Sequence, residues 1–309
     1  MTRTVGIAGL TGKFAQCITK ALQASPDVSI RGYCRSPHNL AKEVLESDKI
    51  EIFEGGFDDY SSIKKFVRGS DVVICCYFGP PEVMTQGQKA LIDACEEENV
   101  PRYIASDFAV DYTKIPPGAL FPKESAMIIM DYLKQKKVAG VHILTGGLME
   151  TFWSDFFGIW SSQTRSLSIW GTGEESWELT TYPTAAAYTA AVALDKSAVG
   201  VLRFCGDRKS ANQIKETFDR VYGSQLHLRQ LGSIDQLYET VQEAYNSDPT
   251  DIASWGPKCF AYWCSSGKAH LGDNLDNSRY PNVEVVDLES FLKGHRMEDL
   301  DRADQILGF

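Results

Sequence analysis

The sequence predicts a doubly wound α/β fold, in which a parallel sheet is covered on both faces, with a smaller C-terminal substrate-binding region. Two patterns predict it. In the first 105 residues, short apolar runs alternate repeatedly with amphipathic stretches, whereas the second half is loosely patterned and rich in aromatic residues. Such alternation is typical of strands joined by right-handed helical crossovers, which produce a parallel sheet.

Each apolar run in the first half has the length of a buried strand, and each stretch between two runs has helical periodicity. The predicted strands are Thr4–Ala8, Ser29–Cys34, Ile50–Phe53, Ser70–Tyr77 and Arg102–Ala105. The predicted helices are Phe14–Ala24, Leu40–Leu45, Tyr60–Phe66 and Gln86–Glu98. Near-continuous apolar strands of this kind are buried on both faces of a parallel sheet.

Beyond residue 105 the pattern predicts fewer elements. The predicted strands are Val141–Leu144, Val201–Cys205 and Val283–Val286, and the predicted helices are Lys123–Lys137, Thr184–Leu194, Gln213–Tyr222 and Ile234–Tyr245. We expect residues 1–150 to form one domain and residues 151–309 to form the substrate-binding region, with some segments returning to the first sheet.

Composition limits the partners that the protein can have. The formal net charge is −10, which argues against nucleic acid or an anionic membrane as the main partner. The eight cysteines lack paired ligand spacing, so we expect no metal and a cytoplasmic protein with reduced thiols. No apolar run is long enough for a signal peptide or a membrane span. A monomer or a homodimer is expected.

A glycine-rich turn directly follows the first predicted strand and precedes the first helix. Gly9 suits a tight turn, Gly12 lets the main chain approach a pyrophosphate, and Ala15 allows close packing of the helix. The free amides at the helix start would face the anion. The alternative is a strand-to-helix turn without a ligand. The predicted phosphate-binding residues are Gly9, Thr11, Gly12, Lys13 and Phe14.

The end of the second predicted strand indicates which dinucleotide binds. A site selective for NAD usually has Asp or Glu there, whereas this sequence has Arg35. A guanidinium matches a 2′-phosphate with paired hydrogen bonds. The sequence therefore predicts NADP(H), and a solvated surface arginine is the alternative.

These motifs resemble the NmrA-like family of atypical short-chain dehydrogenases, which share the Rossmann fold, and in particular its isoflavone reductase-like branch. The resemblance rests on the phosphate turn, on Arg35, and on the segments Gly55-Gly-Phe-Asp-Asp, Gly69-Ser-Asp-Val-Val and Asn99-Val-Pro-Arg-Tyr-Ile-Ala-Ser-Asp-Phe. It implies a reductase that uses NADP(H).

The resemblance also implies a catalytic lysine that contacts cofactor and substrate, and its position here is Lys123. A lysine at the start of a helix has its pKa lowered by the helix dipole, which suits general acid–base work. The alternative is a surface lysine at a helix start. The reductase branch carries a second basic residue four positions later, where this chain has Met127. That difference predicts a more apolar pocket and puts phenolic-ether reduction in doubt.

Further candidates follow predicted strand ends, where ligands of open α/β sheets bind. Tyr77, Phe78, Ser106 and Gly147 are predicted to lie beside the cofactor. The predicted substrate-contacting residues are Asp107, Met127, Met149, Phe152 and Trp153. For Ser106 and Asp107 the alternative is local capping of a strand end. For the aromatic residues and Met149 the alternative is a place in the core.

Three functions remain open from the sequence. The first is an NADP(H)-dependent oxidoreductase that acts on an aromatic small molecule in secondary metabolism, with Lys123 handling the proton. The second is a redox-neutral isomerase or cyclase that depends on NADP. The third is a non-catalytic regulator that senses the dinucleotide, although the resemblance implies that such members lack the lysine.

Overall fold

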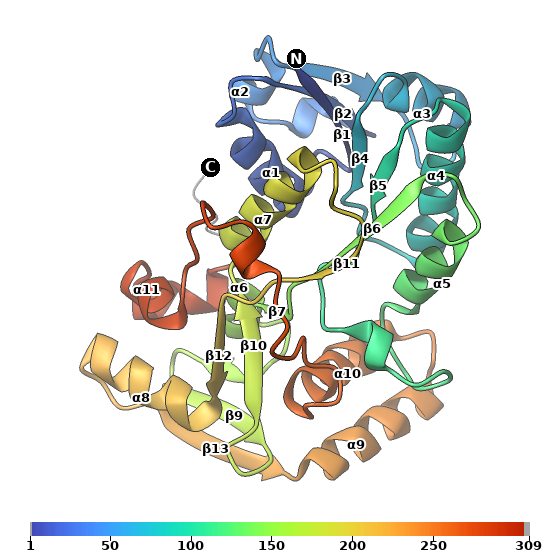
Figure 1. The fold of residues 1–309 in the computed structure, drawn as a ribbon. Coiled ribbons are helices and arrows are strands. Elements are labelled where there is room, and N and C mark those ends of the chain that lie inside the picture. Colours follow the sequence, from blue (N-terminus) through green and yellow to red (C-terminus); the bar gives the residue numbers. More distant parts are fainter. Residues whose placement is uncertain (1, 306–309) are drawn as a thin grey trace.

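The computed structural model describes residues 2–305, and a parallel sheet forms the upper part of Figure 1. Within these residues the sheet has seven strands in the order β11-β6-β5-β4-β1-β2-β3, and all neighbouring pairs are parallel. The strands are β1 Arg3–Ala8, β2 Val28–Cys34, β3 Ile50–Glu54, β4 Val72–Cys75, β5 Arg102–Ile104, β6 Ala139–Leu144 and β11 Gly200–Arg203.

Helices cover both faces of this sheet, because its strands are apolar on both sides. One face is covered by α1 (Lys13–Gln23) and α7 (Tyr182–Leu194), which pack against each other. The other is covered by α3 (Tyr60–Val67), α4 (Gln88–Glu97) and α5 (Glu124–Leu133), as Figure 1 shows. The short α2 (Lys42–Leu45) contacts β3 at the sheet edge. The predicted doubly wound fold is confirmed.

The strand order reverses between β1 and β4. Chain order runs outward from β1 through β2 to β3 and then returns to β4 on the other side of β1. In open α/β sheets this reversal opens a crevice at the carboxyl ends of the strands, and ligands bind there. β11 and α7 come from beyond residue 150 and pack with the first sheet. The division at residue 150 itself stays a prediction.

The remaining elements form the lower part of Figure 1. Two three-stranded sheets, in the orders β12-β10-β7 and β13-β9-β8, pack with helices around an aromatic core. The strands are β7 Gly147–Leu148, β8 Trp160–Ser161, β9 Ser166–Trp170, β10 Ser176–Thr180, β12 Asp207–Ser210 and β13 His227–Gly232. The helices are α6 Met149–Trp153, α8 Ala211–Tyr222, α9 Ile234–Ser247, α10 Ile252–Ser265 and α11 Leu288–Lys293.

The structure corrects one predicted strand. Val283–Val286 does not pair with any strand, because its amides bond elsewhere. The Val283 amide donates to Tyr280 in a turn (3.1 Å), and the Val286 amide donates to the Thr184 hydroxyl (3.2 Å). The predicted helix over Lys123–Lys137 is shorter in the structure, where α5 begins after Lys123 and ends at Leu133.

Short helical turns complete the fold. The 3₁₀ turns are η1 Pro37–Asn39, η3 Tyr112–Lys114, η4 Asn277–Arg279 and η5 Met297–Arg302, and a π-turn, η2 Val83–Gly87, precedes α4. Among residues 2–305, no helix is both long enough and apolar enough to cross a bilayer. The same residues contain no group of three or more His, Cys, Asp or Glu side chains arranged to hold a metal ion.

Candidate active site

A cleft of about 670 Å³ lies at the carboxyl ends of the central strands, where the strand order reverses. The turn after β1 and the residues after β2 line one part of it, and α6, α10 and the start of α7, whose Tyr182 packs on Phe14 at the start of α1, line the rest. A cleft of this size holds a dinucleotide-sized or drug-sized ligand. All eleven residues predicted to bind the cofactor line it: Gly9, Thr11, Gly12, Lys13, Phe14, Arg35, Tyr77, Phe78, Ser106, Lys123 and Gly147.

The turn after β1 leaves space and free donors for an anion. Gly9 has a φ of +85°, and a Cβ there would lie 2.9 Å from the Cys76 carbonyl oxygen. Gly12 is the N-cap of α1, where no side chain caps the first amides and no acidic residue occupies the first turn. The amides that open α1 therefore remain available to a bound anion.

Two cations flank this turn. Lys13 pairs with Asp304 at 3.0 Å, and both residues line the cleft. Arg35 is exposed in the cleft and makes no hydrogen bond or ion pair within residues 2–305. Its guanidinium is therefore free to bind an anionic ligand.

Hydrogen bonds join the strand ends that form the middle of the cleft. The Ser106 hydroxyl donates to the Tyr77 carbonyl oxygen (2.8 Å), and the Ser106 amide donates to Gln88 Oε1 (3.1 Å). Phe108 has a φ of +41°, lines the cleft and packs edge-to-face on Phe14, with ring centroids 4.5 Å apart. Such a positive φ is strained for a non-glycine residue and needs support from its surroundings.

Lys123 is the N-cap of α5 and lines the cleft between the phosphate turn and the aromatic end. Its Nζ donates to the main-chain carbonyl oxygen of Asp107. Burial lowers the pKa of Lys123 from 10.5 to about 8, and the charge of Asp107 opposes this shift. An amine with a pKa near 8 can both give and accept a proton close to neutral pH.

The five residues predicted to contact substrate do not line the cleft. Asp107 is completely buried and bonded to His142 and Tyr112, and Met127 packs on the core of the second region. The other three lie on α6 and fill that core, where their side chains are at most 1% exposed: Met149, Phe152 and Trp153. The core alternative considered for the aromatic residues is the one that the structure shows.

Neighbours on the opposite face of α6 line the substrate end instead. Leu148, Thr151 and Ser154 are three residues apart, which places them on one helical face. The remaining lining residues at this end come from segments distant in sequence: Phe156, Phe157, Tyr182, Phe260 and Cys264. The helical period after Gly147 could have identified the first three, whereas no local signal indicated that α7 and α10 reach the cleft.

A buried carboxylate joins α6 to the start of α7. Both Glu150 carboxylate oxygens accept the Tyr182 amide, at 3.0 and 2.9 Å, and Thr181 caps the same helix end. Burial raises the pKa of Glu150 from 4.5 to about 7. The Tyr182 ring also packs on Phe14, with ring centroids 5.9 Å apart, so α1 and α7 meet at the cleft wall.

Comparison with known proteins identifies the first part of the chain. Residues 9–152 match a family described as NAD(P)H-binding. Residues 9–152 are an NAD(P)H-binding domain. The predicted nicotinamide cofactor is confirmed at that level, and the free amides of α1 and the approach space at Gly9 fit its diphosphate.

Solved structures show the fold of the whole chain. A crystal structure of isoflavone reductase matches with a TM-score of 0.78 at 18% identity, over 95% of this chain and 99% of that one. A structure of AtPrR2 with NADP+ and (+)pinoresinol matches with a TM-score of 0.77 at 18% identity, over 95% of this chain and 98% of that one. The chain therefore has the isoflavone reductase fold, as the resemblance implied.

A fungal protein is similar over a shorter segment. The oxidoreductase aflX of Aspergillus parasiticus is 32% identical over 74 residues, which are 23% of this chain. The aligned segment spans 28% of the length of that relative.

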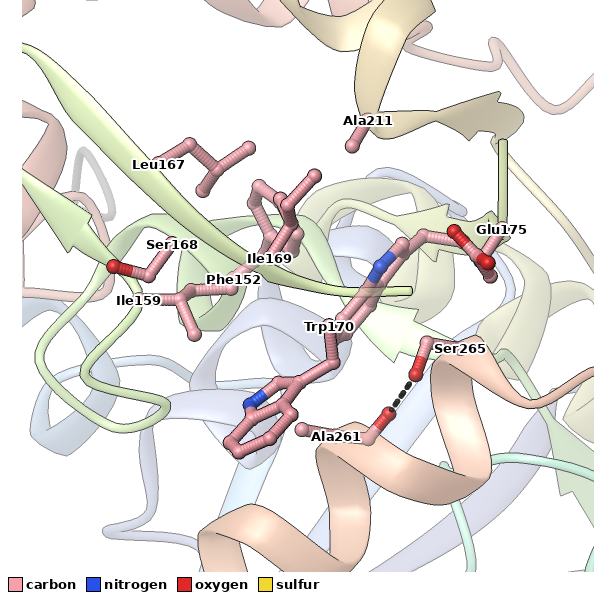
Figure 2. Close-up of a pocket in the computed structure, with 11 residues that line it drawn as sticks. Phe152, Ile159, Leu167, Ser168, Ile169, Trp170, Glu175, Ala211, Ala261 and Ser265 are labelled. Carbon is pink, nitrogen blue, oxygen red and sulfur yellow. Dashed lines mark hydrogen bonds between the residues drawn. The ribbon is translucent and has the colours of Figure 1, made fainter. Parts of the chain in front are cut away.

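A second, much smaller void lies among β9, α8 and α10 (Figure 2). It measures about 20 Å³ and is lined mainly by apolar side chains, including Ile169 and Trp170. The Ser265 hydroxyl beside it donates to the Ala261 carbonyl oxygen at 2.8 Å, the bond drawn in Figure 2. A void of this size holds at most about one water molecule, so it is not a ligand site.

Proposed function

We propose that the protein is an NADP(H)-dependent oxidoreductase that acts on an aromatic small molecule in secondary metabolism. The observation that carries the proposal is the place of Lys123: a half-buried amine with a pKa of about 8, between a dinucleotide turn and an aromatic cavity wall. A dinucleotide-sensing module has no need for an acid–base group there.

The preference for NADP over NAD follows from Arg35. Its guanidinium stands beyond the end of β2, where a ribose 2′-substituent lies in folds of this type. Because no carboxylate of residues 2–305 pairs with it, its charge remains available to the extra phosphate. An arginine at this point also removes the acceptor that an unmodified ribose diol needs.

The residues around Lys123 suit proton transfer. A bound reduced nicotinamide would supply the hydride. Lys123 would polarise the substrate atom on which charge develops and donate a proton to it. The carbonyl of Asp107 holds the amine in place, and Ser106 fixes the loops that border it.

The aromatic substrate class rests on the wall of the cleft. Phe156 packs on both Phe157 and Phe260, and the three rings form apolar and aromatic surface in the cleft. Aromatic side chains favour flat ring systems by offset or edge-on packing. One relative of the same fold was solved with (+)pinoresinol, which supports a phenolic ring compound as the starting point.

The test is turnover of NADPH by purified protein with a panel of enones, imines and quinone methides that carry aromatic rings. We expect loss of the reduced-nicotinamide absorbance with at least one member and deuterium transfer from labelled NADPH into the product. The matched control is Lys123→Met, which keeps a similar side-chain volume without the amine. Dependence on NADP without net consumption would indicate the redox-neutral isomerase or cyclase, and binding without turnover would indicate the regulator.

A further inference from the structure

A buried polar cluster lies behind Lys123, on the side away from the cleft. Asp107 Oδ2 is 2.7 Å from His142 Nδ1 and 3.0 Å from the Tyr112 hydroxyl, and that hydroxyl is 3.2 Å from His142 Nδ1. The three residues are at most 4% exposed. They come from the end of β5, from β6 and from η3, so three separate segments meet at one carboxylate.

Such a cluster is a costly way to fill a core. A buried carboxylate is tolerated only when hydrogen bonds or charges compensate its lost hydration. Here Asp107 Oδ1 is buried and has no hydrogen-bond partner among residues 2–305. Apolar side chains of similar volume would pack this space without that cost. The cluster therefore has a role other than packing.

The backbone of Asp107 connects the cluster to the cleft. Its carbonyl oxygen accepts the hydrogen bond from Lys123 Nζ. The next residue, Phe108, is in the left-handed region and its amide donates to the Ile143 carbonyl oxygen at 2.9 Å. A strained peptide of this kind keeps its orientation only when its surroundings hold it. The hydrogen bonds of the Asp107 side chain to His142 and Tyr112 fix this peptide in its orientation.

We propose that Asp107, His142 and Tyr112 form a positioning cluster for Lys123, aiming its amine through the Asp107 carbonyl and favouring its protonated form through the buried carboxylate. This inference rests on the proposed function, in which Lys123 is the acid–base group. None of the three is a catalytic residue, because none lines the cleft.

The sign of the electrostatic effect is fixed by the charges around the amine. Burial lowers the pKa of Lys123 and the negative charge of Asp107 raises it. A charged Cys75 thiolate would also raise the pKa of Lys123. Burial raises the pKa of the Cys75 thiol to about 12, however, so the thiol is neutral near pH 8. Glu124 follows Lys123 but is exposed on α5, where water screens its charge. Removal of the Asp107 charge must therefore lower the pKa of Lys123 further.

The first experiment measures that pKa without any substrate. The rate at which an amine-acylating reagent labels Lys123 is followed against pH by mass spectrometry of the peptide that contains it. In Asp107→Asn, which keeps the side-chain shape, we expect the pKa of Lys123 to fall by about one unit or more. Glu124→Gln is the matched control, because it removes the same charge from the residue next to Lys123. We expect it to leave the pKa of Lys123 unchanged.

The second experiment tests the hold on the carbonyl. Tyr112→Phe keeps the carboxylate and removes one of its hydrogen bonds, so the Asp107–Phe108 peptide can relax and the amine becomes better hydrated. We expect kcat to fall roughly tenfold with an unchanged KM for NADPH. We also expect the pKa of Lys123 to rise toward 10.5, the opposite direction from Asp107→Asn.

The pKa of Lys123 is expected to fall in Asp107→Asn and to rise in Tyr112→Phe. These opposite shifts distinguish a positioning role from a general loosening of the fold. If Asp107→Asn raises the pKa of Lys123 or leaves it unchanged, the proposal is overturned. Should Asp107→Asn not fold, Tyr112→Phe decides: an unchanged labelling pKa in that variant overturns the proposal. Absence of turnover by the unaltered protein counts against the proposed function alone. The acylation rates report the pKa of Lys123, and so the effect of the cluster, without any substrate.

Discussion

The two ends of the cleft are built in different ways. At the dinucleotide end, the lining residues come from short turns that directly follow β1, β2 and β4. The main-chain amides that open α1 are the donors available to an anion there. At the substrate end, side chains from α6, α7 and α10 converge from segments that together span more than 100 residues of the sequence. The first end depends on backbone geometry and the second on tertiary packing.

This difference explains why one end can be predicted from sequence and the other cannot. Position 9 has a φ of +85°, and a Cβ there would lie 2.9 Å from the Cys76 carbonyl oxygen. Because other residues are strained in this conformation, the position requires glycine, and a glycine can be recognised in the sequence. The place of an aromatic side chain cannot be recognised in this way, since Phe152 in the core and Phe156 in the cleft are the same residue type four positions apart. Only packing separates their roles.

The largest expected effect comes from Lys123, which stands where the two ends meet. In Lys123→Met we expect kcat/KM to fall by about 10²–10⁴-fold, because the proton donor is lost, while NADPH still binds. In the unaltered protein, reduction needs the protonated amine, so its rate should fall as pH rises through about 8. Steady-state rates against pH and calorimetric titration with NADPH measure both. Equal rates for variant and parent would contradict the role of Lys123.

Stability provides the control for the same variant. The pKa of Lys123 is lower in the folded chain than its usual 10.5, so the folded state binds fewer protons than the unfolded state between pH 8 and 10.5. The cost of burying the ammonium is therefore fully present below pH 8 and is relieved as pH rises through that window. Lys123→Met should unfold no more easily than the parent at pH 7 in a urea titration.

A smaller effect is expected at the dinucleotide end. Arg35→Gln removes the guanidinium but keeps polarity, and we expect the Kd for NADPH to rise about 10- to 100-fold with little change for NADH. The matched control is Arg165→Gln, at an exposed arginine in a turn that does not line the cleft. Calorimetry with both dinucleotides measures the ratio. A parallel loss for NADPH and NADH would show that Arg35 does not read the 2′-phosphate.

The smallest effect on activity is expected at the substrate end, and a matched pair of variants sharpens the comparison. Phe156→Ala removes an aromatic ring that is 40% exposed in the cleft, so KM should rise about tenfold with stability nearly unchanged. Phe152→Ala opens a cavity in the core and should cost about 3–5 kcal/mol of unfolding free energy. Urea titrations and KM values for the two variants test whether they separate in this way.

Much of the fold and of the dinucleotide end was predictable, for physical reasons. The strands of the first sheet are short apolar runs with helical periods between them, and the glycines at positions 9 and 12 allow a tight turn and a close approach of the main chain to a ligand. In the second half of the chain, local patterns predicted the helices α7, α8 and α9 but not most of the strands. β12 is the polar segment Asp207–Ser210, and α10 contains Gly256 and Pro257, so neither has the usual signal of its element.

The site residues divide in the same way. Lys123 was singled out by the family resemblance and its catalytic role stays a prediction, whereas the lowering of its pKa follows from burial, which the sequence alone did not show. Asp107 was predicted on the correct loop but for the wrong environment, since the direction of its side chain depends on His142 and Tyr112. No spacing in the sequence links those three residues.

The ion pair between Lys13 and Asp304 has a consequence for how fast the dinucleotide leaves. The carboxylate stands beside the turn that receives the diphosphate, so a bound diphosphate and Asp304 compete for one ammonium. When the oxidised dinucleotide departs, the carboxylate is in place to take over the cation at once. An exposed pair of this kind is worth at most about 1 kcal/mol, so we expect it to shorten the residence time of a bound dinucleotide by a few-fold at most.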